Sequence, residues 1–185
     1  MDSRIRSLWK RVEKADRDAA CELLQLYYPA VFAYLRRLCG SREEAEDLTQ
    51  QTFLKVWSAR HGFAGRSTFS TWLHRIAYNT YVDWQREKAF DVRRCPEPWW
   101  LERPQELPVP CADVADRQLA QRLYEAVDQL GDDKRHVVHL HYYQGLSLRE
   151  TAQVLEIATS TVKYRLREVL KVLRKKMKAQ EITSA

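Results

Sequence analysis

The chain has 185 residues, enough for one domain of ordinary size or two small ones, and carries a net charge of +6. With 45% hydrophobic residues, five Gly and six Trp, its composition excludes an intrinsically disordered protein. No apolar run is long enough to span a bilayer, and the charged N-terminal stretch does not fit a signal peptide, so we expect a cytoplasmic protein without membrane insertion.

The sequence of the first half of the chain predicts a series of helices. The aromatic-rich stretch 19–39 predicts one helix, in which Pro29 would introduce a bend. Ser41 and Glu44 have the spacing of a capping box, which predicts a second helix that ends near residue 57. A loop at 59–67 precedes a third helix at about 68–90. Helical spacing predicts that one face of this third helix points inward, and this inner stripe contains Phe69, Leu73, Ile76, Thr80 and Trp84. An outer arc contains Arg75, Asn79, Val82 and Arg86.

Five of the six prolines lie between residues 90 and 112. Proline has no amide donor and disfavours helix in the residue before it, so this stretch is predicted to be a linker. We therefore expect two small helical domains, 1–90 and 113–185, joined by a Pro-rich linker at 91–112. The predicted fold class is all-α.

The second half has the layout of a helix-turn-helix. Leucine and valine spacing predicts a helix that ends near Leu130, and a second helix follows Gly131 and ends near Gly145. Ser147 and Glu150 form another capping box, which predicts a short helix to residue 155. A turn at 156–158 leads into a last helix at 159–178. A short helix, a tight turn and a longer helix are typical of DNA-binding proteins.

The last helix separates apolar and basic residues onto opposite faces. The apolar face contains Val162, Leu166, Val169, Leu170, Leu173 and Met177, and the basic face contains Lys163, Arg167, Lys171, Arg174 and Lys178. From 159 to 178 there are eight basic residues and one acidic residue, a local balance of +7. Many basic helix faces are merely solvated, but this one follows a capped helix and a turn. We expect it to bind DNA phosphates and to read bases near its N-terminal end.

Three stretches resemble motifs of bacterial sigma factors. Residues 47–57, DLTQQTFLKVW, resemble the D-x-x-Q-x-x-F-x-K-x-W stretch of sigma region 2. Residues 69–79, FSTWLHRIAYN, followed by Asp83 and Arg86, are similar to F-x-x-W-L-x-R-I-A-x-N-x-x-x-D-x-x-R of the same region. Residues 145–152, GLSLRETA, and 161–166, TVKYRL, resemble region 4. The order, the spacing and the Pro-rich join resemble the extracytoplasmic-function (ECF) group, over residues 10–178.

The resemblance implies that the chain binds core RNA polymerase through its beta and beta-prime subunits and directs initiation at specific promoters. It implies promoter DNA and an anti-sigma factor as further partners. The residues that would meet the clamp helices of beta-prime are Asp47, Gln50, Phe53, Lys55 and Trp57, although core packing is an alternative for the two aromatic residues. The residues that would hold the minus-ten element, with loop 59–67, are Arg66, Trp72, Arg75, Asn79 and Arg86. The residues that would read the minus-35 element are Ser160, Thr161, Lys163, Tyr164, Arg167, Lys171 and Arg174.

Two positions depart from the family pattern. The turn at 157–161 lacks the Pro and Gly often found there, and Glu168 stands where many relatives have a basic residue. Both leave the base specificity open. The pair Trp99 and Trp100 has no counterpart in the pattern.

Two other classes of protein share part of the pattern. An ordinary helix-turn-helix regulator would explain the last helix but not the motifs at 47–57 and 69–79. An enzyme would need a catalytic or metal site, and the one cluster of metal-ligand type is His136, His139 and His141. No Asp, Glu or Cys completes a ligand set, the four Cys are scattered, and no nucleotide-binding signature is present. We expect no enzyme activity, metal or cofactor.

Overall fold

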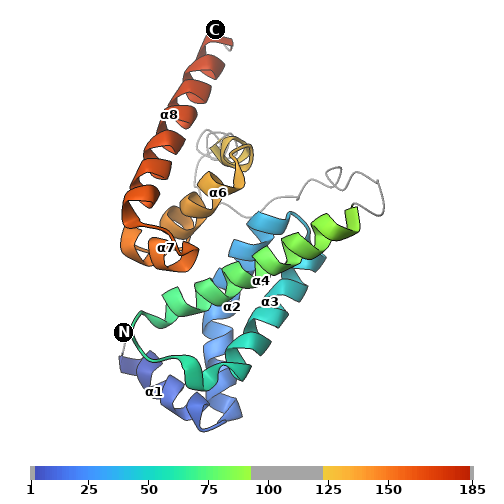
Figure 1. Cartoon of the computed structure of the whole chain (residues 1–185), viewed down its shortest axis with the longest axis vertical. Helices are drawn as coiled ribbons and strands as arrows, with labels where there is room; N and C mark the ends of the chain where they lie inside the picture. The colour runs from blue at the N-terminus through green and yellow to red at the C-terminus, as the bar shows by residue number, and fades with distance from the viewer. Residues whose placement is uncertain (1–2, 93–122, 184–185) are drawn as a thin grey trace. The chain divides into compact units, whose positions relative to one another are not determined.

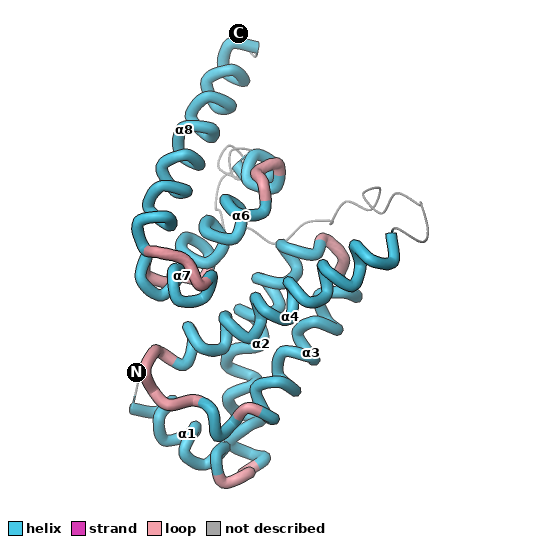
Figure 2. The backbone as a smooth tube through the Cα atoms, viewed as in Figure 1, coloured by secondary structure: helices cyan, strands magenta, loops and turns pink. Residues whose placement is uncertain are grey.

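The computed structural model describes residues 3–92 and 123–183. Within these ranges every regular element is a helix (Figures 1 and 2), which confirms the all-α prediction. The chain divides into two compact units, one built on α1–α4 and the other on α6–α8, as expected for two helical domains. Most of the predicted linker at 91–112, including Trp99 and Trp100, lies outside the described residues, so the domain bounds stay a prediction.

The first unit is a helical bundle whose ends are set by capping residues. Its elements are α1 (Ser3–Glu13), α2 (Arg17–Cys39), α3 (Arg42–Ser58), the short 3₁₀ helix η1 (Arg60–Gly62) and α4 (Phe69–Val92). Asp16 caps α2 by accepting from the Ala19 amide at 3.1 Å, and α2 ends at Gly40, whose φ of 78° suits glycine. Ser41 caps α3, as predicted. Helix α2 continues through Pro29, and α1 was not predicted as a helix.

The core of the first unit lies between α1, α2, α3 and the inner face of α4. Phe69, Leu73 and Thr80 are buried, as the predicted inner stripe required, but Ile76 and Trp84 are only half-buried. The remaining buried positions on α4 are Thr71, His74, Ala77 and Tyr81. The buried face of α4 is therefore rotated by about one residue from the predicted stripe, because it does not follow the largest apolar side chains. Small and polar side chains fill the close contacts instead.

The described part of the second unit consists of four short helical segments and a long last helix. Its elements are a helical segment at 123–128, α6 (Asp132–Val138), the π-helical turn η3 (His139–Tyr143), α7 (Leu148–Leu155) and α8 (Thr159–Thr183). Its core cluster contains Val127, Leu130, Val138 and Val169, and partly buried residues packed on it are Tyr143, Val172 and Leu173. This core fixes α8 against the segments that precede the turn.

The predicted capping box at the start of α7 is complete. The Ser147 hydroxyl accepts from the Glu150 amide at 3.2 Å, and the Glu150 carboxylate accepts from the Ser147 amide at 2.9 Å. Helix α7 ends at Glu156, whose φ is 55°, and the Ile157 amide donates to the Ala152 carbonyl at 3.1 Å. The chain then enters α8 at Thr159. The helix-turn-helix is therefore confirmed with the predicted turn.

Two details of the second unit differ from the predictions. Leu170 was assigned to the packed face of the last helix, but it is 41% exposed, and Val172 packs on the core instead. Helix α8 ends at Thr183 rather than near 178. The side chains of Met177 and Lys178 lie outside the described ones. Because the core beneath α8 is short, only its first four turns need a continuous apolar face.

Candidate polymerase and nucleic-acid interfaces

Helix α3 exposes a mixed polar and apolar row. Asp47 and Gln50 are exposed, as a contact surface for another protein requires. Leu54 lies in the same row, since residues three, four and seven apart share a face of a helix. Its exposed fraction of 60% is large for leucine. Motif matching missed Leu54 because the motif has a variable position there, and the signal that could have found it is its helical spacing from Asp47 and Gln50.

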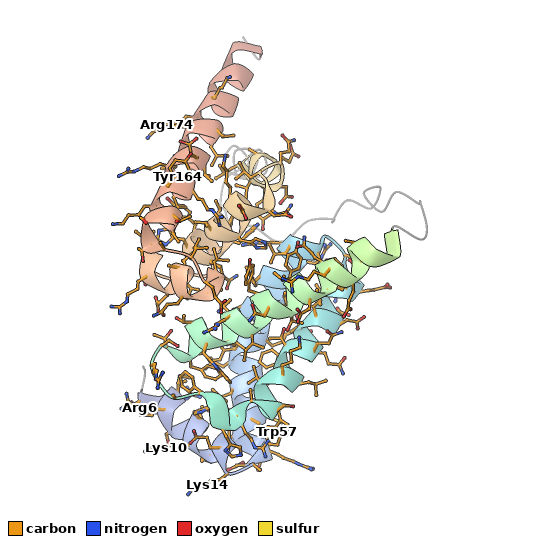
Figure 3. The ribbon with its side chains drawn as sticks, viewed as in Figure 1. Arg6, Lys10, Lys14, Trp57, Tyr164 and Arg174 are labelled. Atoms are coloured by element: carbon orange, nitrogen blue, oxygen red, sulfur yellow. The ribbon has the colours of Figure 1, made fainter. Side chains whose placement is uncertain are left out.

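The other predicted polymerase-binding residues of α3 make contacts with neighbouring parts of the first unit. Phe53 is half-buried, with its ring centroid 6.4 Å from that of Tyr28 on α2. Lys55 forms an ion pair with Asp83 on α4, with Nζ and Oδ2 3.2 Å apart. Trp57 is half-buried, and the Arg60 guanidinium lies 5.1 Å above its ring (Figure 3). Asp47, Gln50, Leu54 and Lys55 are thus exposed, while Phe53, Lys55 and Trp57 also contact neighbouring parts of the unit.

Helix α4 exposes three of the four residues of its predicted outer arc, while Val82 is half-buried. Arg75, Asn79 and Arg86 are all exposed and lie at spacings of four and seven residues, so they share one face. Asp83, beside them, lies 4.0 Å from Arg86 as well as 3.2 Å from Lys55. An open cleft of about 430 Å³ lies next to this row, lined by Gln51, Lys55, Thr80, Asp83, Trp84, Arg86 and Glu87. The face combines cations, an amide and aromatic surface, which are the groups that bind unstacked bases.

The loop before α4 is held by an aromatic cluster. Trp72 is half-buried, with its ring centroid 5.2 Å from both Trp9 and Phe63 and 5.9 Å from Phe69. Arg66 is exposed at the tip of the loop. Of these two predicted minus-ten residues, Arg66 is exposed to solvent. Trp72 is only partly exposed, and its ring contacts help to position the loop.

The exposed face of α8 gathers nearly all the predicted minus-35 residues. These residues are Ser160, Lys163, Tyr164, Arg167, Lys171 and Arg174, and each is exposed. Tyr164 is 63% exposed, and Figure 3 labels it together with Arg174 on this helix. Thr161 is half-buried and lies to one side of the row. The face is a nearly continuous basic strip beginning at the turn that follows α7.

Charge pairs divide the cations of α8 into two groups. Lys171 pairs with Glu168 at 2.8 Å, and this contact raises the pKa of Lys171 and lowers the pKa of Glu168. Arg165 pairs with Asp133 of α6 at 2.8 Å and is only one fifth exposed, so it stabilises the unit rather than facing a ligand. Lys163, Arg167 and Arg174 form no ion pair with a described residue. Glu168, the unusual residue for the family pattern, therefore pairs with Lys171, and Lys134 also contributes to lowering its pKa.

The three histidines of the second unit are packing residues. His136 and His139 are buried, and His141 is half-buried with Nδ1 2.7 Å from the Leu146 carbonyl oxygen. Burial and the nearby Arg135 lower the pKa of His136 to about 4. Within 3–92 and 123–183, no group of three or more His, Cys, Asp or Glu residues is arranged to hold a metal ion.

The fold and its exposed basic helix define a two-unit DNA-binding transcription factor. Its sequence matches the family models for sigma-70 region 2 at residues 23–90 and sigma-70 region 4 at residues 120–173. It is 30% identical to the ECF RNA polymerase sigma factor SigW of Bacillus subtilis, over 96% of this chain and 99% of that protein. It is 33% identical to the ECF RNA polymerase sigma factor SigX of the same organism, over 84% of this chain and 81% of that protein. The chain belongs to the ECF group of the sigma-70 family.

A solved structure supports the same assignment. The sigma factor RpoE of Bartonella quintana, crystallised with the anti-sigma factor NepR, is 25% identical with a TM-score of 0.73 and covers 85% of this chain and 95% of that one. As a sigma factor, the chain acts in promoter-specific transcription initiation, with core RNA polymerase and promoter DNA as partners. None of the helices in the described ranges has the length and apolar character needed to cross a membrane.

Proposed function

We propose that the chain uses three separate surfaces during initiation. The α3 row of Asp47, Gln50 and Leu54 binds the beta-prime subunit of core polymerase. The outer arc of α4 and the loop before it hold the separated strand of the minus-ten element. The exposed face of α8 binds the minus-35 element as duplex. The chain itself performs no catalysis, and it works in the cytoplasm.

The polymerase contact is supported by the composition of the α3 row. An exposed leucine between polar residues matches the core of a protein interface, where an apolar side chain is buried inside a polar rim. Leu54 is 60% exposed in the unit, so most of its side chain is available to a partner. Phe53 and Lys55 would support the contact by fixing the direction of α3.

The minus-ten assignment rests on Asn79. Its side chain is exposed, and no hydrogen bond joins it to another described residue. Its amide can therefore donate to and accept from a base edge without breaking an existing contact. Arg75 and Arg86 flank it on the same face and can neutralise phosphates of the displaced strand.

The minus-35 assignment rests on the order of residues along α8. Ser160, Lys163 and Tyr164 lie in the first turns after the helix-turn-helix turn, where side chains reach base edges in the major groove. Lys171 and Arg174 lie two to three turns further along, where phosphate contact is expected. Arg167 lies between them, and we assign it to base reading.

Regulation by an anti-sigma factor follows from the resemblance to RpoE of Bartonella quintana, which was crystallised with one. An inhibitor of this kind works by covering a surface that the polymerase or the promoter needs. The row of Asp47, Gln50 and Leu54 and the basic face of α8 are the surfaces that it would have to cover.

The proposal is tested by separating strand opening from duplex binding. Asn79→Ala removes hydrogen bonds that form only after bases leave the stack. Binding to duplex promoter should stay within about twofold, because it depends on α8 and on phosphates. Permanganate reactivity and run-off transcription should fall about tenfold or more on duplex template. On a template mismatched across the minus-ten element, most of the transcription should return.

Gln25→Ala is the matched control, since Gln25 is an exposed side-chain amide on α2 that neither belongs to the row of Arg75, Asn79 and Arg86 nor lines the cleft beside it. It should leave opening unchanged. Wild-type opening by Asn79→Ala would remove the outer arc of α4 from the minus-ten contact.

A further inference from the structure

Helix α1 and the turn that follows it carry three cations on the side opposite the core. Arg6, Lys10 and Lys14 are exposed, and no ion pair joins any of them to a described residue. Their spacing of four residues places them in one row, about 6 Å apart along the helix axis. Figure 3 labels all three along α1 and the turn that follows it.

The other two cations of α1 are neutralised within the unit. Arg4 pairs with Glu22 at 2.6 Å, and Arg11 pairs with Asp16 at 2.8 Å. Glu13 is the one acidic residue of α1, and no ion pair within the described residues involves it. The positive charges of Arg6, Lys10 and Lys14 are therefore available to bind a ligand.

The apolar face of α1 is already occupied. Ile5, Leu8, Trp9 and Val12 are each 5% exposed or less. A helix that binds a lipid surface needs a free apolar face to insert, and α1 has none. A row of cations without apolar surroundings instead suits a polyanion held through its charges, and nucleic acid is the polyanion that this family contacts.

Trp9 connects this row to the minus-ten surface. Its ring centroid lies 5.6 Å from that of Phe63 in the loop and 5.2 Å from that of Trp72 at the start of α4. The α1 cations and the exposed Arg66 of the same loop consequently belong to one packed unit. DNA placed on the loop and on α4 would continue toward α1. The match to sigma region 2 starts at residue 23, after α1.

We infer that Arg6, Lys10 and Lys14 bind backbone phosphates of promoter DNA next to the minus-ten element, on the side of loop 59–67. This inference rests on the proposed placement of the minus-ten strand. Such contacts carry no base specificity, and they add affinity that falls with salt.

The test compares two double variants that remove the same charge from the same helix. Arg6→Gln with Lys10→Gln removes two unpaired cations, and Arg4→Gln with Arg11→Gln removes two paired ones. Reconstituted holoenzyme is titrated with promoter DNA and with a scrambled duplex across a range of salt concentrations. We expect the first variant to make the plot of log affinity against log salt shallower by about 1.5, at 0.7–0.9 per lost phosphate contact. The second variant should change it by less than about 0.5.

Each outcome has a distinct reading. If wild-type holoenzyme does not prefer promoter to scrambled duplex, the proposed function fails, whatever the α1 variants do. If that preference is present and both variants have the wild-type slope, the α1 inference is overturned. A loss of core polymerase binding in the absence of DNA, specific to the Arg6 and Lys10 variant, would also overturn it and assign the row to an acidic protein surface.

Discussion

The two helical units display their functional side chains in different ways. In the first unit, exposed candidates are spread over α1, α3 and α4 and include acids, amides, a leucine and cations. In the second unit, they lie on a single face of α8 and are mostly basic. The proposed roles of the two units account for the difference. A surface that meets both a protein and unstacked bases needs several chemistries, whereas a surface that meets duplex phosphates needs mainly charge and one straight helix.

The interiors of the two units differ as well. The first contains a cluster of Trp9, Phe63, Phe69 and Trp72 with ring centroids 5.1–5.9 Å apart. The second is built from aliphatic side chains with two buried histidines. All six Trp precede residue 101. Tryptophan fluorescence therefore reports on the first part of the chain, while circular dichroism reports on both units, so the units can be followed separately.

The largest expected effect concerns the polymerase surface of the first unit. Asp47→Arg with Gln50→Ala should weaken core polymerase binding by more than about 100-fold, on the order of 3 kcal/mol, because a reversed charge opposes the partner's surface. Leu54→Ser alone should cost roughly tenfold by removing the apolar centre. Co-purification and titration with core enzyme measure both.

Asp18→Arg with Gln25→Ala makes the same chemical changes at exposed positions of α2 and should bind normally. Circular dichroism should show unchanged helix content in all variants. Normal binding by the Asp47 and Gln50 variant would exclude this row of α3 from the contact.

Much of the architecture could be predicted because local signals and tertiary structure agree. Ser41 and Ser147 cap the helices that they were expected to cap, and Glu156 ends α7 where a turn was expected. The basic face of α8 was predicted from spacing alone, since a long helix in a small domain has only one face to bury. Local hydrogen bonds and helical periodicity suffice for such features.

Other features depend on packing that no local pattern contains. The π-helical turn at 139–143, with the Gln144 amide 3.0 Å from the His139 carbonyl, arises where the chain must turn within a fixed core. The burial of Ala77 and Tyr81 rather than Ile76 and Trp84 depends on which helix approaches α4 most closely. The exposure of Leu54 likewise depends on which elements pack on α3 and not on its own sequence neighbours. The polymerase and DNA roles of individual residues stay predictions.

The second prediction uses pH to separate the stabilities of the two units. His136 has a pKa of about 4 in the folded unit because burial disfavours the imidazolium, against about 6.5 when unfolded. Between pH 4 and pH 6.5, His136 is protonated in the unfolded state but not in the folded state. The free energy of unfolding is therefore greatest above pH 6.5 and falls as the pH drops toward 4. The second unit should lose up to about 3 kcal/mol over this window. Urea unfolding at several pH values, followed by circular dichroism, measures the loss.

The control for this prediction is His136→Gln, a side chain of similar size that does not titrate. It should flatten the pH dependence of the circular dichroism transition, even if it lowers stability at neutral pH. The transition seen by tryptophan fluorescence should be the same in both proteins. A wild-type pH dependence in the Gln variant would show that another group causes the loss.

The third prediction tests the orientation of α8 on DNA. Arg167→Ala should change which minus-35 bases are preferred, at a cost of roughly 1–3 kcal/mol on the best sequence. Lys171→Ala should weaken binding equally on all sequences and make the salt slope shallower by less than about one, because Glu168 already pairs with Lys171. Binding to a randomised minus-35 library at two salt concentrations measures both. Equal losses of specificity would show that the assignment of base and phosphate contacts along α8 is wrong.

The smallest expected effect compares the two helix caps. At Ser147 both halves of the capping box form, at 3.2 and 2.9 Å, whereas the Ser41 hydroxyl lies 3.5 Å from the Glu44 amide. Ser147→Ala removes a well-formed acceptor and should cost about 1 kcal/mol; Ser41→Ala should cost about half of that. Helix α7 has only eight residues, so the loss at Ser147 also loosens the support of the turn into α8. Ser147→Ala should therefore shift only the unfolding transition seen by circular dichroism, and it should lower affinity for minus-35 duplex. Ser41→Ala should slightly shift the unfolding transition seen by tryptophan fluorescence, and it should leave duplex affinity unchanged. If Ser41→Ala were the more destabilising of the two, hydrogen-bond length would be the wrong guide to cap strength in this fold.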